Sequence, residues 1–147
     1  MNDGFSFRTL RLTGRAPDPL ALGLYKRLFR ESGEGDLERD MQDWGRHQIA
    51  PWTLSHAGND VGVGGFRLGF GDDGLEVLFH FLPDMWGQGL ASEFLLAAMD
   101  HARGTLKEHR FFGRVSGGSD SSKRVMEKAG FRAEAQNADG QLLMRLG

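Results

Sequence analysis

Residues 75–102 constrain the fold of this chain more than any other stretch. The first eight are rich in Leu, Val and Phe, which favours a buried β-strand, and Pro83 ends that strand because it has no N–H to donate to a ladder. Gly87 and Gly89 then predict a turn in which the backbone can approach a ligand closely. A helix is predicted to begin near Leu90, so the stretch is a strand, a glycine turn and a helix.

A helix that follows such a turn is a candidate binding site for an anion. Its first N–H groups have no partner inside the helix, and they carry partial positive charge. The spacing of apolar residues also predicts that one face of this helix packs on a sheet. That face consists of Leu90, Phe94, Leu95, Ala98 and Ala102.

Length and composition narrow the class of protein. A chain of 147 residues suits one domain with its own core, and no repeat or linker divides it, so residues 1–147 are predicted to form a single domain. The formal net charge of −2 gives no basic field that would draw the chain to nucleic acid or to a membrane. There is no cysteine and no close pairing of histidines, so no metal site is expected. Without a signal-peptide pattern or a long apolar run, the expected location is cytoplasmic.

The other segments alternate between strand and helix patterns, which predicts a mixed α/β domain with mainly antiparallel strands. Strands are predicted at residues 5–12, 49–56, 61–70, 75–82, 111–116, 131–136 and 141–146. Helices are predicted at 20–30 and 37–48 with a break at 32–36, from 90 onward, and after residue 119. Ser119 is the expected N-cap of the last helix, and Gly130 is the expected left-handed residue that ends it.

Two segments together resemble the GNAT superfamily of acetyl-CoA-dependent N-acetyltransferases. The first is WGQGLA, Trp86–Ala91, which is similar to the pyrophosphate loop often written Q/R-x-x-G-x-G/A. Trp86 stands in the leading position, a form that resembles the branch related to ribosomal-protein N-terminal acetyltransferases (RimJ/RimL-like). The second segment, Ser119–Phe131, is similar to the family's Asn-x-x-Ser…Glu-Lys-x-Gly-Phe pattern, with Ser119 in place of the Asn.

The resemblance implies both a fold and a co-substrate. The fold is a GNAT-like α/β (α+β) domain, in which about four helices flank a mixed, mainly antiparallel central sheet of about six to seven strands. The co-substrate is acetyl-CoA, whose diphosphate would be cradled by backbone N–H groups of the loop. The residues implied in cofactor binding are Phe81, Leu82, Trp86, Gly87, Gln88, Gly89, Leu90, Ala91, Ser119 and Ser122.

Acetyl transfer to an amine needs a group that takes a proton from the nitrogen, and Glu76 is the first candidate for this general base. It matches a glutamate found early in the corresponding strand of many family members. The alternative is a strand-end glutamate that only pairs with an arginine. His80 is the second candidate, although a lone histidine between two phenylalanines is more often a core residue. Glu76 and His80 are separated by about 13 Å along an extended strand, so they cannot form a hydrogen-bonded pair.

The remaining requirements of acetyl transfer fall on the end of this strand and on the last helix. Backbone N–H groups near Phe81 and Leu82 are candidates for an oxyanion hole, at a place where the resemblance implies that neighbouring strands splay apart. The single tyrosine, Tyr25, lies in the first helix, which leaves vacant the family's usual proton donor to the departing thiolate. The RimL-like resemblance implies Ser122 in that role, and ordinary helix capping is the alternative for this residue.

The region that would bind the acceptor amine is less well marked. Trp44, His47, Trp52 and His56 cluster between the second helix and the next strand, where they would line either an acceptor site or the core. Arg67 is expected to pair with an acidic substrate or with Glu76.

The sequence leaves two main functions open, with a structural interaction domain as a weaker third. One is an enzyme that moves an acetyl group from acetyl-CoA to a primary amine, on a protein N-terminus or a small molecule, by direct attack in a ternary complex. The other is a non-catalytic acyl-CoA-binding sensor or regulatory module. For both, we expect a monomer or a homodimer with no nucleic-acid or membrane partner.

Overall fold

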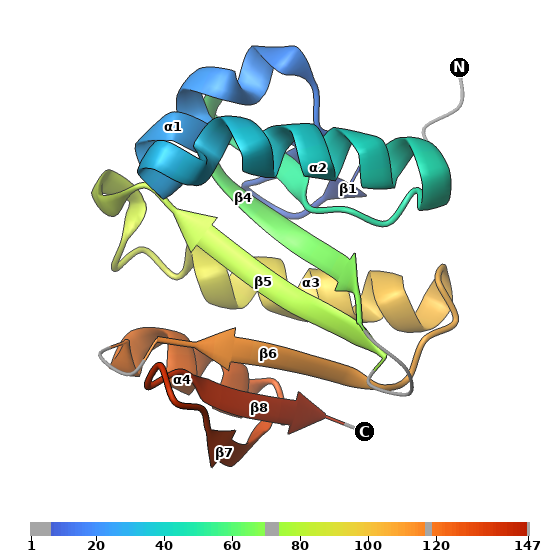
Figure 1. Cartoon of the computed structure of the whole chain (residues 1–147), viewed down its shortest axis with the longest axis vertical. Coiled ribbons are helices and arrows are strands. Elements are labelled where there is room, and N and C mark those ends of the chain that lie inside the picture. Colours follow the sequence, from blue (N-terminus) through green and yellow to red (C-terminus); the bar gives the residue numbers. More distant parts are fainter. Residues whose placement is uncertain (1–6, 70–73, 117–118, 147) are drawn as a thin grey trace.

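One mixed sheet runs through the computed structural model, which describes residues 7–69, 74–116 and 119–146 and places eight strands among them (Figure 1). The strands are β1 (Phe7–Arg8), β2 (Thr13–Arg15), β3 (Trp52–His56), β4 (Asn59–Leu68), β5 (Leu75–Phe81), β6 (Phe111–Val115), β7 (Arg132–Gln136) and β8 (Leu142–Leu146). Their order is β1-β2-β3-β4-β5-β6-β8-β7, and only β5 and β6 pair in parallel. The helices are α1 (Leu22–Phe29), α2 (Gly33–His47), α3 (Leu90–Gly104) and α4 (Asp120–Lys128), with short 3-10 turns at Pro19–Ala21, Arg30–Ser32 and Pro83–Met85. The expected mixed, mainly antiparallel class is therefore confirmed.

The additional strand comes from the N-terminal segment, where the prediction of a single strand over residues 5–12 is wrong. The chain reverses between Thr9 and Leu12, and the Thr9 N–H donates to the Leu12 carbonyl at 2.8 Å. The Thr9 hydroxyl in turn accepts a hydrogen bond from the Leu12 N–H at 3.0 Å. Because a threonine that bonds its own nearby backbone favours a turn, the segment forms the β1–β2 hairpin. Residues 5 and 6 lie outside the described part of the chain.

The helices cover the two faces of the sheet in pairs, with α1 and α2 over one face and α3 and α4 over the other (Figure 1). The strand β5 contributes every second residue to one core, as the predicted period of two requires. Leu75, Val77 and Phe81 pack into the core beneath α3 and α4, whereas Leu82, just after the strand, packs beneath α1 and α2. All five residues of the predicted face of α3 are buried in the first of these cores.

The break predicted at residues 32–36 lies largely inside α2, which begins at Gly33. The reversal happens one step earlier, because Arg30 has a φ of 56° and the Arg30–Ser32 turn redirects the chain. A Cβ at Gly33 would lie 2.6 Å from the Tyr25 carbonyl oxygen, so glycine allows α2 to start directly against α1. The glycine here marks a close helix contact and not a loop.

The pairing of β5 with β6 is short, and this is the feature that creates the site. Leu75 pairs with Phe111 and Glu76 with Phe112, and beyond these residues the two strands separate. In Figure 1 the two arrows diverge toward the side where the chain enters α3. The splay that the family resemblance implies is therefore present, and it begins just after Glu76.

Candidate active site

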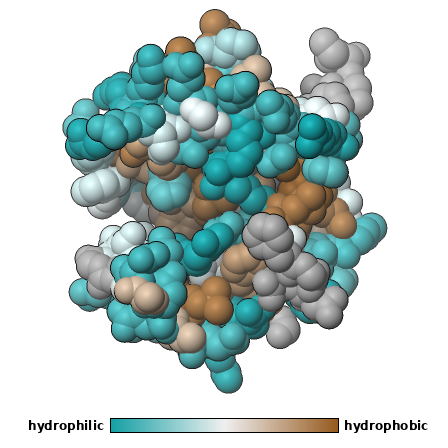
Figure 2. Space-filling view, in the orientation of Figure 1, coloured by the Kyte–Doolittle hydropathy of each residue, from teal (hydrophilic) through white to brown (hydrophobic). Residues whose placement is uncertain are grey.

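A cleft of about 140 Å³ lies between the separated strands. Its walls come from the second half of β5, the end of β6 and the first turns of α4. In Figure 2 the surface is hollowed between the upper and lower parts of the molecule, with hydrophobic residues visible inside the recess. The lining residues are Val77, Leu78, Phe79, His80, Arg114, Val115, Ser116, Ser119, Ser122 and Met126.

Glu76 lies at the narrow end of this cleft and is held by Arg114 of β6. The guanidinium Nε and Nη2 donate to Oε2 and Oε1 of the carboxylate, each at 3.2 Å. The Glu76 side chain is 16% exposed and that of Arg114 is 47% exposed, so the pair is open to water on the arginine side. The arginine-paired alternative for Glu76 is thus present in the structure, and it puts the carboxylate in contact with a residue that lines the cleft.

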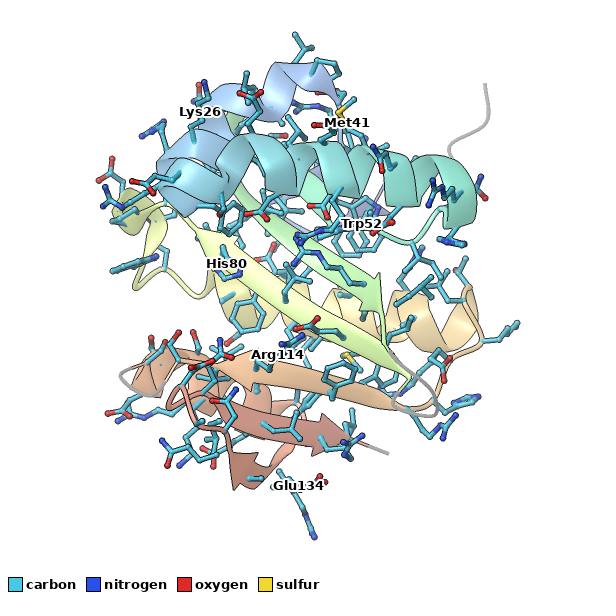
Figure 3. All side chains as sticks on the ribbon, viewed as in Figure 1. Lys26, Met41, Trp52, His80, Arg114 and Glu134 are labelled. Atoms are coloured by element: carbon cyan, nitrogen blue, oxygen red, sulfur yellow. The ribbon has the colours of Figure 1, made fainter. Side chains whose placement is uncertain are left out.

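His80 lies farther along β5, on the same strand face as Glu76 and nearer the open end of the cleft (Figure 3). Its ring packs edge-on against Phe29 of α1, with ring centres 5.0 Å apart. Partial desolvation lowers the pKa of His80 below its ordinary value, and the positive charge of Arg67 lowers it further. Because part of the side chain remains exposed, we interpret His80 as a neutral, accessible imidazole at pH 7.

The two serines of the second motif meet β5 across the cleft. Ser119 occupies the N-cap position of α4, but its side chain makes no capping hydrogen bond, with the backbone at φ −101° and ψ 76°. Ser122, in the first turn of α4, also lines the cleft. Among the described residues, the Ser119 hydroxyl is not used to cap the helix, which leaves it available to a ligand in the cleft. Gly130, with a φ of 100°, follows the helix as the predicted left-handed residue.

The hydrogen bonds at the end of β5 distinguish the two candidate oxyanion-hole donors, the N–H groups of Phe81 and Leu82. The Leu82 N–H donates to the Val61 carbonyl at 2.9 Å, so it is used within the sheet. Because N–H groups alternate in direction along a strand, that of Phe81 points away from β4 toward the cleft side. The Phe81 carbonyl accepts a hydrogen bond of 2.8 Å from the Trp86 indole, which ties the glycine loop to the strand.

The predicted anion loop has the expected backbone geometry. Gly87 and Gly89 have φ values of 80° and 78°, and no atom lies within 4 Å of a Cβ built at Gly87. The first hydrogen bond of α3 runs from the Glu93 N–H to the Gly89 carbonyl. The N–H groups of Leu90 and Ala91 therefore have no partner within the helix, and no side chain caps it. The residues of this loop are not among those that line the 140 Å³ cleft.

An arginine that the sequence analysis missed lies beside this loop. Glu93, in the first turn of α3, accepts hydrogen bonds from the Thr9 hydroxyl at 2.6 Å and from the Arg11 N–H at 2.7 Å. It also pairs with the Arg11 Nε at 2.7 Å. Desolvation raises the pKa of Glu93, but the bonds from Thr9 and Arg11 outweigh it, so the pKa lies below its ordinary value. Thr9 and Glu93 are 84 residues apart, so no local pattern signals this contact.

Arg67 does not pair with Glu76, although the two are register partners on β4 and β5. Its Nε and Nη2 donate instead to the two carboxylate oxygens of Asp40, both at 3.2 Å. Asp40 is fully buried, and it also accepts a hydrogen bond of 2.7 Å from the Tyr25 hydroxyl. This network joins α1, α2 and β4 through the side chains of Tyr25, Asp40 and Arg67. The prediction that Arg67 pairs with Glu76 is therefore wrong.

The aromatic and histidine residues proposed for the acceptor site do not meet at the cleft. Trp52 is buried and stacks on Phe7 with ring centres 4.2 Å apart. Trp44 and Trp52 line a separate cavity of about 170 Å³ at the far end of α3, together with His101. His56 is hydrogen-bonded through Nδ1 to the Arg11 carbonyl oxygen at 3.0 Å. The core interpretation of Trp52 is the one that the structure supports.

Among the described residues, no group of three or more His, Asp or Glu side chains is arranged to hold a metal ion. Within the same ranges, no helix combines the length and apolar character needed to cross a membrane.

Residues 10–132 match the family described as Acetyltransferase (GNAT) domain. The chain belongs to this family. The match covers β2 to β6, the glycine loop and α4, so the resemblance on the two motifs is confirmed over most of the chain. A comparison with curated proteins gives no match.

Solved structures share this GNAT fold over nearly the full chain. A putative GnaT-family acetyltransferase from Bordetella pertussis is 20% identical, over 97% of this chain and 99% of that one, with a TM-score of 0.83. RimJ from Mycobacterium smegmatis, in complex with CoA-disulfide, is 17% identical, over 96% of this chain and 86% of that one, with a TM-score of 0.74. The spermidine/spermine N-acetyltransferase SpeG from Vibrio cholerae is 19% identical, over 92% of both chains, with a TM-score of 0.71.

GNAT acetyltransferases take their acetyl group from acetyl-CoA, and the loop residues of this chain suit its diphosphate. Left-handed glycines with no Cβ expose the backbone, and the unpartnered N–H groups at the start of α3 are donors for anionic oxygens. Sequence reasoning located this loop, Glu76 and the two serines. It allowed for an arginine partner of Glu76 without identifying Arg114, and it missed the arginine beside Gly89.

Proposed function

We propose that this protein transfers the acetyl group of acetyl-CoA to a primary amine by direct attack in a ternary complex. The observation that supports this most strongly is the cleft that opens where β5 leaves β6, with Ser119 and Ser122 on one wall and His80 on the other. A cleft between separated strands lets the thioester arm of a co-substrate lie beside the exposed backbone of β5, while the amine approaches from the α1–α2 face. No cysteine is present, which excludes a cysteine acyl-enzyme.

In this proposal the anion end of the co-substrate is bound by Trp86–Ala91. The backbone N–H groups at the start of α3 hold the diphosphate, and the small residues allow close approach. The Phe81 N–H is the donor to the thioester oxygen, since it points away from β4 and the Leu82 N–H is bound to Val61. Leu82 would then contribute apolar contact and not a hydrogen bond.

The chemistry requires that the amine nitrogen lose a proton and that the departing thiolate be stabilised. The amine nitrogen forms a bond to the thioester carbon, the C–S bond breaks, and the proton lost from nitrogen passes to a general base. We assign that base to Glu76, acting through a water molecule because Arg114 occupies both carboxylate oxygens. Ser122 is assigned a hydrogen bond to the sulfur, which stabilises the thiolate as it leaves.

A second assignment of the base is supported by one specific observation. His80 lines the cleft directly, whereas Glu76 reaches it only through Arg114. A lowered pKa leaves the imidazole able to accept a proton at pH 7. The two candidates are distinguished by substitution, because they do not form a hydrogen-bonded pair and each can be replaced separately.

The acceptor class is proposed to be the α-amine of a protein N-terminus or the amine of a small molecule. RimJ and SpeG share the fold, and the name of SpeG, a spermidine/spermine N-acetyltransferase, gives a small polyamine as its acceptor. The RimJ/RimL-like branch, suggested by the Trp-Gly-x-Gly-x-Ala-x-Glu form of the loop, favours the first. The cytoplasmic location and the monomeric or homodimeric state stay predictions.

The test is release of free thiol from acetyl-CoA in the presence of an amine panel. The panel comprises short peptides with free N-termini, spermidine and free amino acids, with a reaction lacking amine as the blank. We expect amine-dependent thiol release with the wild-type chain and its loss in Glu76→Gln. Binding of CoA with no amine-dependent release would support the sensor module instead. If CoA does not bind, both functions are wrong.

A further inference from the structure

The loop that receives the diphosphate contains no cationic side chain of its own. Residues 86–91 read WGQGLA, and the leading position that carries Gln or Arg in the family pattern is Trp86. The Trp86 indole N–H is already committed to the Phe81 carbonyl at 2.8 Å. Backbone N–H groups supply hydrogen bonds but only partial charge, so a diphosphate bound here would lack a full positive charge from the loop.

Arg11, near the start of the chain, brings a full positive charge to the same loop. Its Nη2 lies 3.6 Å from the position of a Cβ built on Gly89, beside the exposed part of the loop. The Nε and the backbone N–H are both bound by Glu93, which fixes the guanidinium against the first turn of α3. Among the described residues, no acceptor is bound to Nη1 or Nη2. The free edge of the guanidinium therefore lies next to the exposed backbone of Gly89.

The negative charge of Glu93 is compatible with an anion bound at the start of α3. A carboxylate in the first turn of α3 would repel an anion bound at the helix start. Here its two oxygens receive bonds from Thr9 and Arg11, so its charge is directed at the β1–β2 turn and is balanced by the guanidinium. The Thr9 hydroxyl also accepts a hydrogen bond from the Leu12 N–H, so it ties the β1–β2 turn, and Arg11 within it, to the start of α3.

We propose that Arg11 binds the diphosphate of acetyl-CoA and supplies the charge that the WGQGLA loop lacks, with Glu93 and Thr9 as its positioning residues. The inference rests on the proposed use of acetyl-CoA and adds a second chain segment to that binding site. A planar guanidinium with one edge anchored and the other free is suited to two parallel hydrogen bonds to phosphate oxygens.

The test compares a ligand that carries the diphosphate with one that lacks it. Binding of CoA is measured by calorimetry, and acetyl transfer from S-acetylpantetheine measures the same site without the diphosphate. We expect Arg11→Gln to raise the Kd for CoA about 10- to 100-fold, the range for loss of a charged hydrogen bond. Its kcat/KM for S-acetylpantetheine should stay within about twofold of wild type.

Arg8→Gln is the matched control, because it removes the same charge from the same hairpin at an exposed residue of β1. It should change the Kd for CoA less than about threefold. Unchanged CoA binding in Arg11→Gln would overturn the proposal. An equal loss with both substrates would also overturn it, because it would show that Arg11 only stabilises the fold through Glu93. If Arg11→Gln does not fold, Arg11→Lys is compared on the same two substrates, with selective loss again expected. Wild-type protein that does not bind CoA would show that the proposed function itself is wrong.

Discussion

Glu76 and Arg114 close the narrow end of the cleft with two parallel hydrogen bonds, each 3.2 Å between a guanidinium nitrogen and a carboxylate oxygen. The two residues are 38 positions apart and lie on the only parallel pair of strands among the described residues. They meet at the point where β5 and β6 begin to separate. The pair thus joins the strands just before the splay, and it holds the Glu76 carboxylate against a residue that lines the cleft.

Substitution at this pair tests Glu76 as the base. If Glu76 accepts the amine proton, Glu76→Gln lowers kcat/KM by about 10²- to 10⁴-fold, because general-base assistance is lost. Arg114→Gln should retain activity within about tenfold, since the carboxylate remains and the pair is open to water on the arginine side. Steady-state kinetics with a saturating amine separate the two variants. Full activity in Glu76→Gln would transfer the assignment to His80.

Ser122 is expected to contribute less than the base does. Ser122→Ala should lower kcat about 3- to 30-fold with little change in KM for acetyl-CoA, because one neutral hydrogen bond to the sulfur is lost. Ser121→Ala on the same helix turn is the control, since Ser121 is exposed and does not line the cleft. A change in thermal stability without a change in kcat would instead indicate a structural role.

The lowered pKa of His80 predicts that the fold loses stability below neutral pH. Desolvation and the charge of Arg67 lower its pKa in the folded state, and together they outweigh Asp36 and Glu76, which act in the opposite direction. Stability linked to the neutral ring is therefore fully present above the unfolded pKa of about 6.5, and it is lost as the pH falls through the folded pKa.

Urea unfolding at pH 7.5 and pH 5 measures this difference for His80. Wild type should lose more stability between the two pH values than His80→Gln does. His109→Gln, at an exposed histidine, should behave as wild type. Equal losses in wild type and His80→Gln would contradict the lowered pKa.

The contact between Glu93 and the hairpin predicts a second, more acidic transition. The pKa of Glu93 is lowered in the folded state, so its stabilising effect is present above the unfolded pKa of about 4.3 and is lost as the pH falls through the folded value. Glu93→Gln should melt at a lower temperature than wild type at pH 7, with the gap closing near pH 3. Glu31→Gln, at an exposed site, is the control. An unchanged melting temperature for Glu93→Gln at pH 7 would argue against a stabilising pair.

Tyr25 provides a spectroscopic test of the buried network because it is the only tyrosine in the chain. Burial raises its pKa, and the adjacent Asp40 carboxylate raises it further. The contribution of the neutral phenol is present below the unfolded pKa of about 10 and is lost as the pH rises toward the folded value. Tyrosinate absorbance should therefore appear only with alkaline unfolding.

Removal of the same hydroxyl is expected to destabilise the fold. Tyr25→Phe leaves Asp40 buried with fewer donors, so the free energy of unfolding should fall by about 1–3 kcal/mol in urea titration. Phe29→Leu changes the neighbouring ring and leaves the hydrogen bond between Tyr25 and Asp40 in place, so it is the control for a packing change alone. Tyrosinate absorbance below pH 10 in folded protein would contradict the buried hydrogen bond.

The parts of the site that depend on local sequence were predictable. The glycine turn before α3, the apolar face of that helix, the strand parity of β5 and the left-handed Gly130 all follow from residues close together in the chain. Each is governed by backbone conformation or by the burial of one face. The family motif added the identity of the anion, because a helix start alone does not choose between phosphates.

The parts that depend on distant partners were not predictable. Thr9 turns the N-terminal segment into a hairpin and bonds to Glu93, 84 residues away. Arg67 pairs with Asp40 and not with its register partner Glu76, and Glu76 pairs with Arg114. The choice of ion-pair partner depends on which charge the packed helices bury, because a buried carboxylate requires a partner more than a surface one does.

The sequence by itself therefore determined the strand, turn and helix at residues 75–102 and the two motifs that place the chain among GNAT acetyltransferases. Only the tertiary structure decided where β5 and β6 separate, which residue holds Glu76 and which cation lies beside Gly89. The reason is physical: periodicity and glycine conformation act over a few residues, whereas charge pairing and strand divergence depend on segments that meet only in the folded chain.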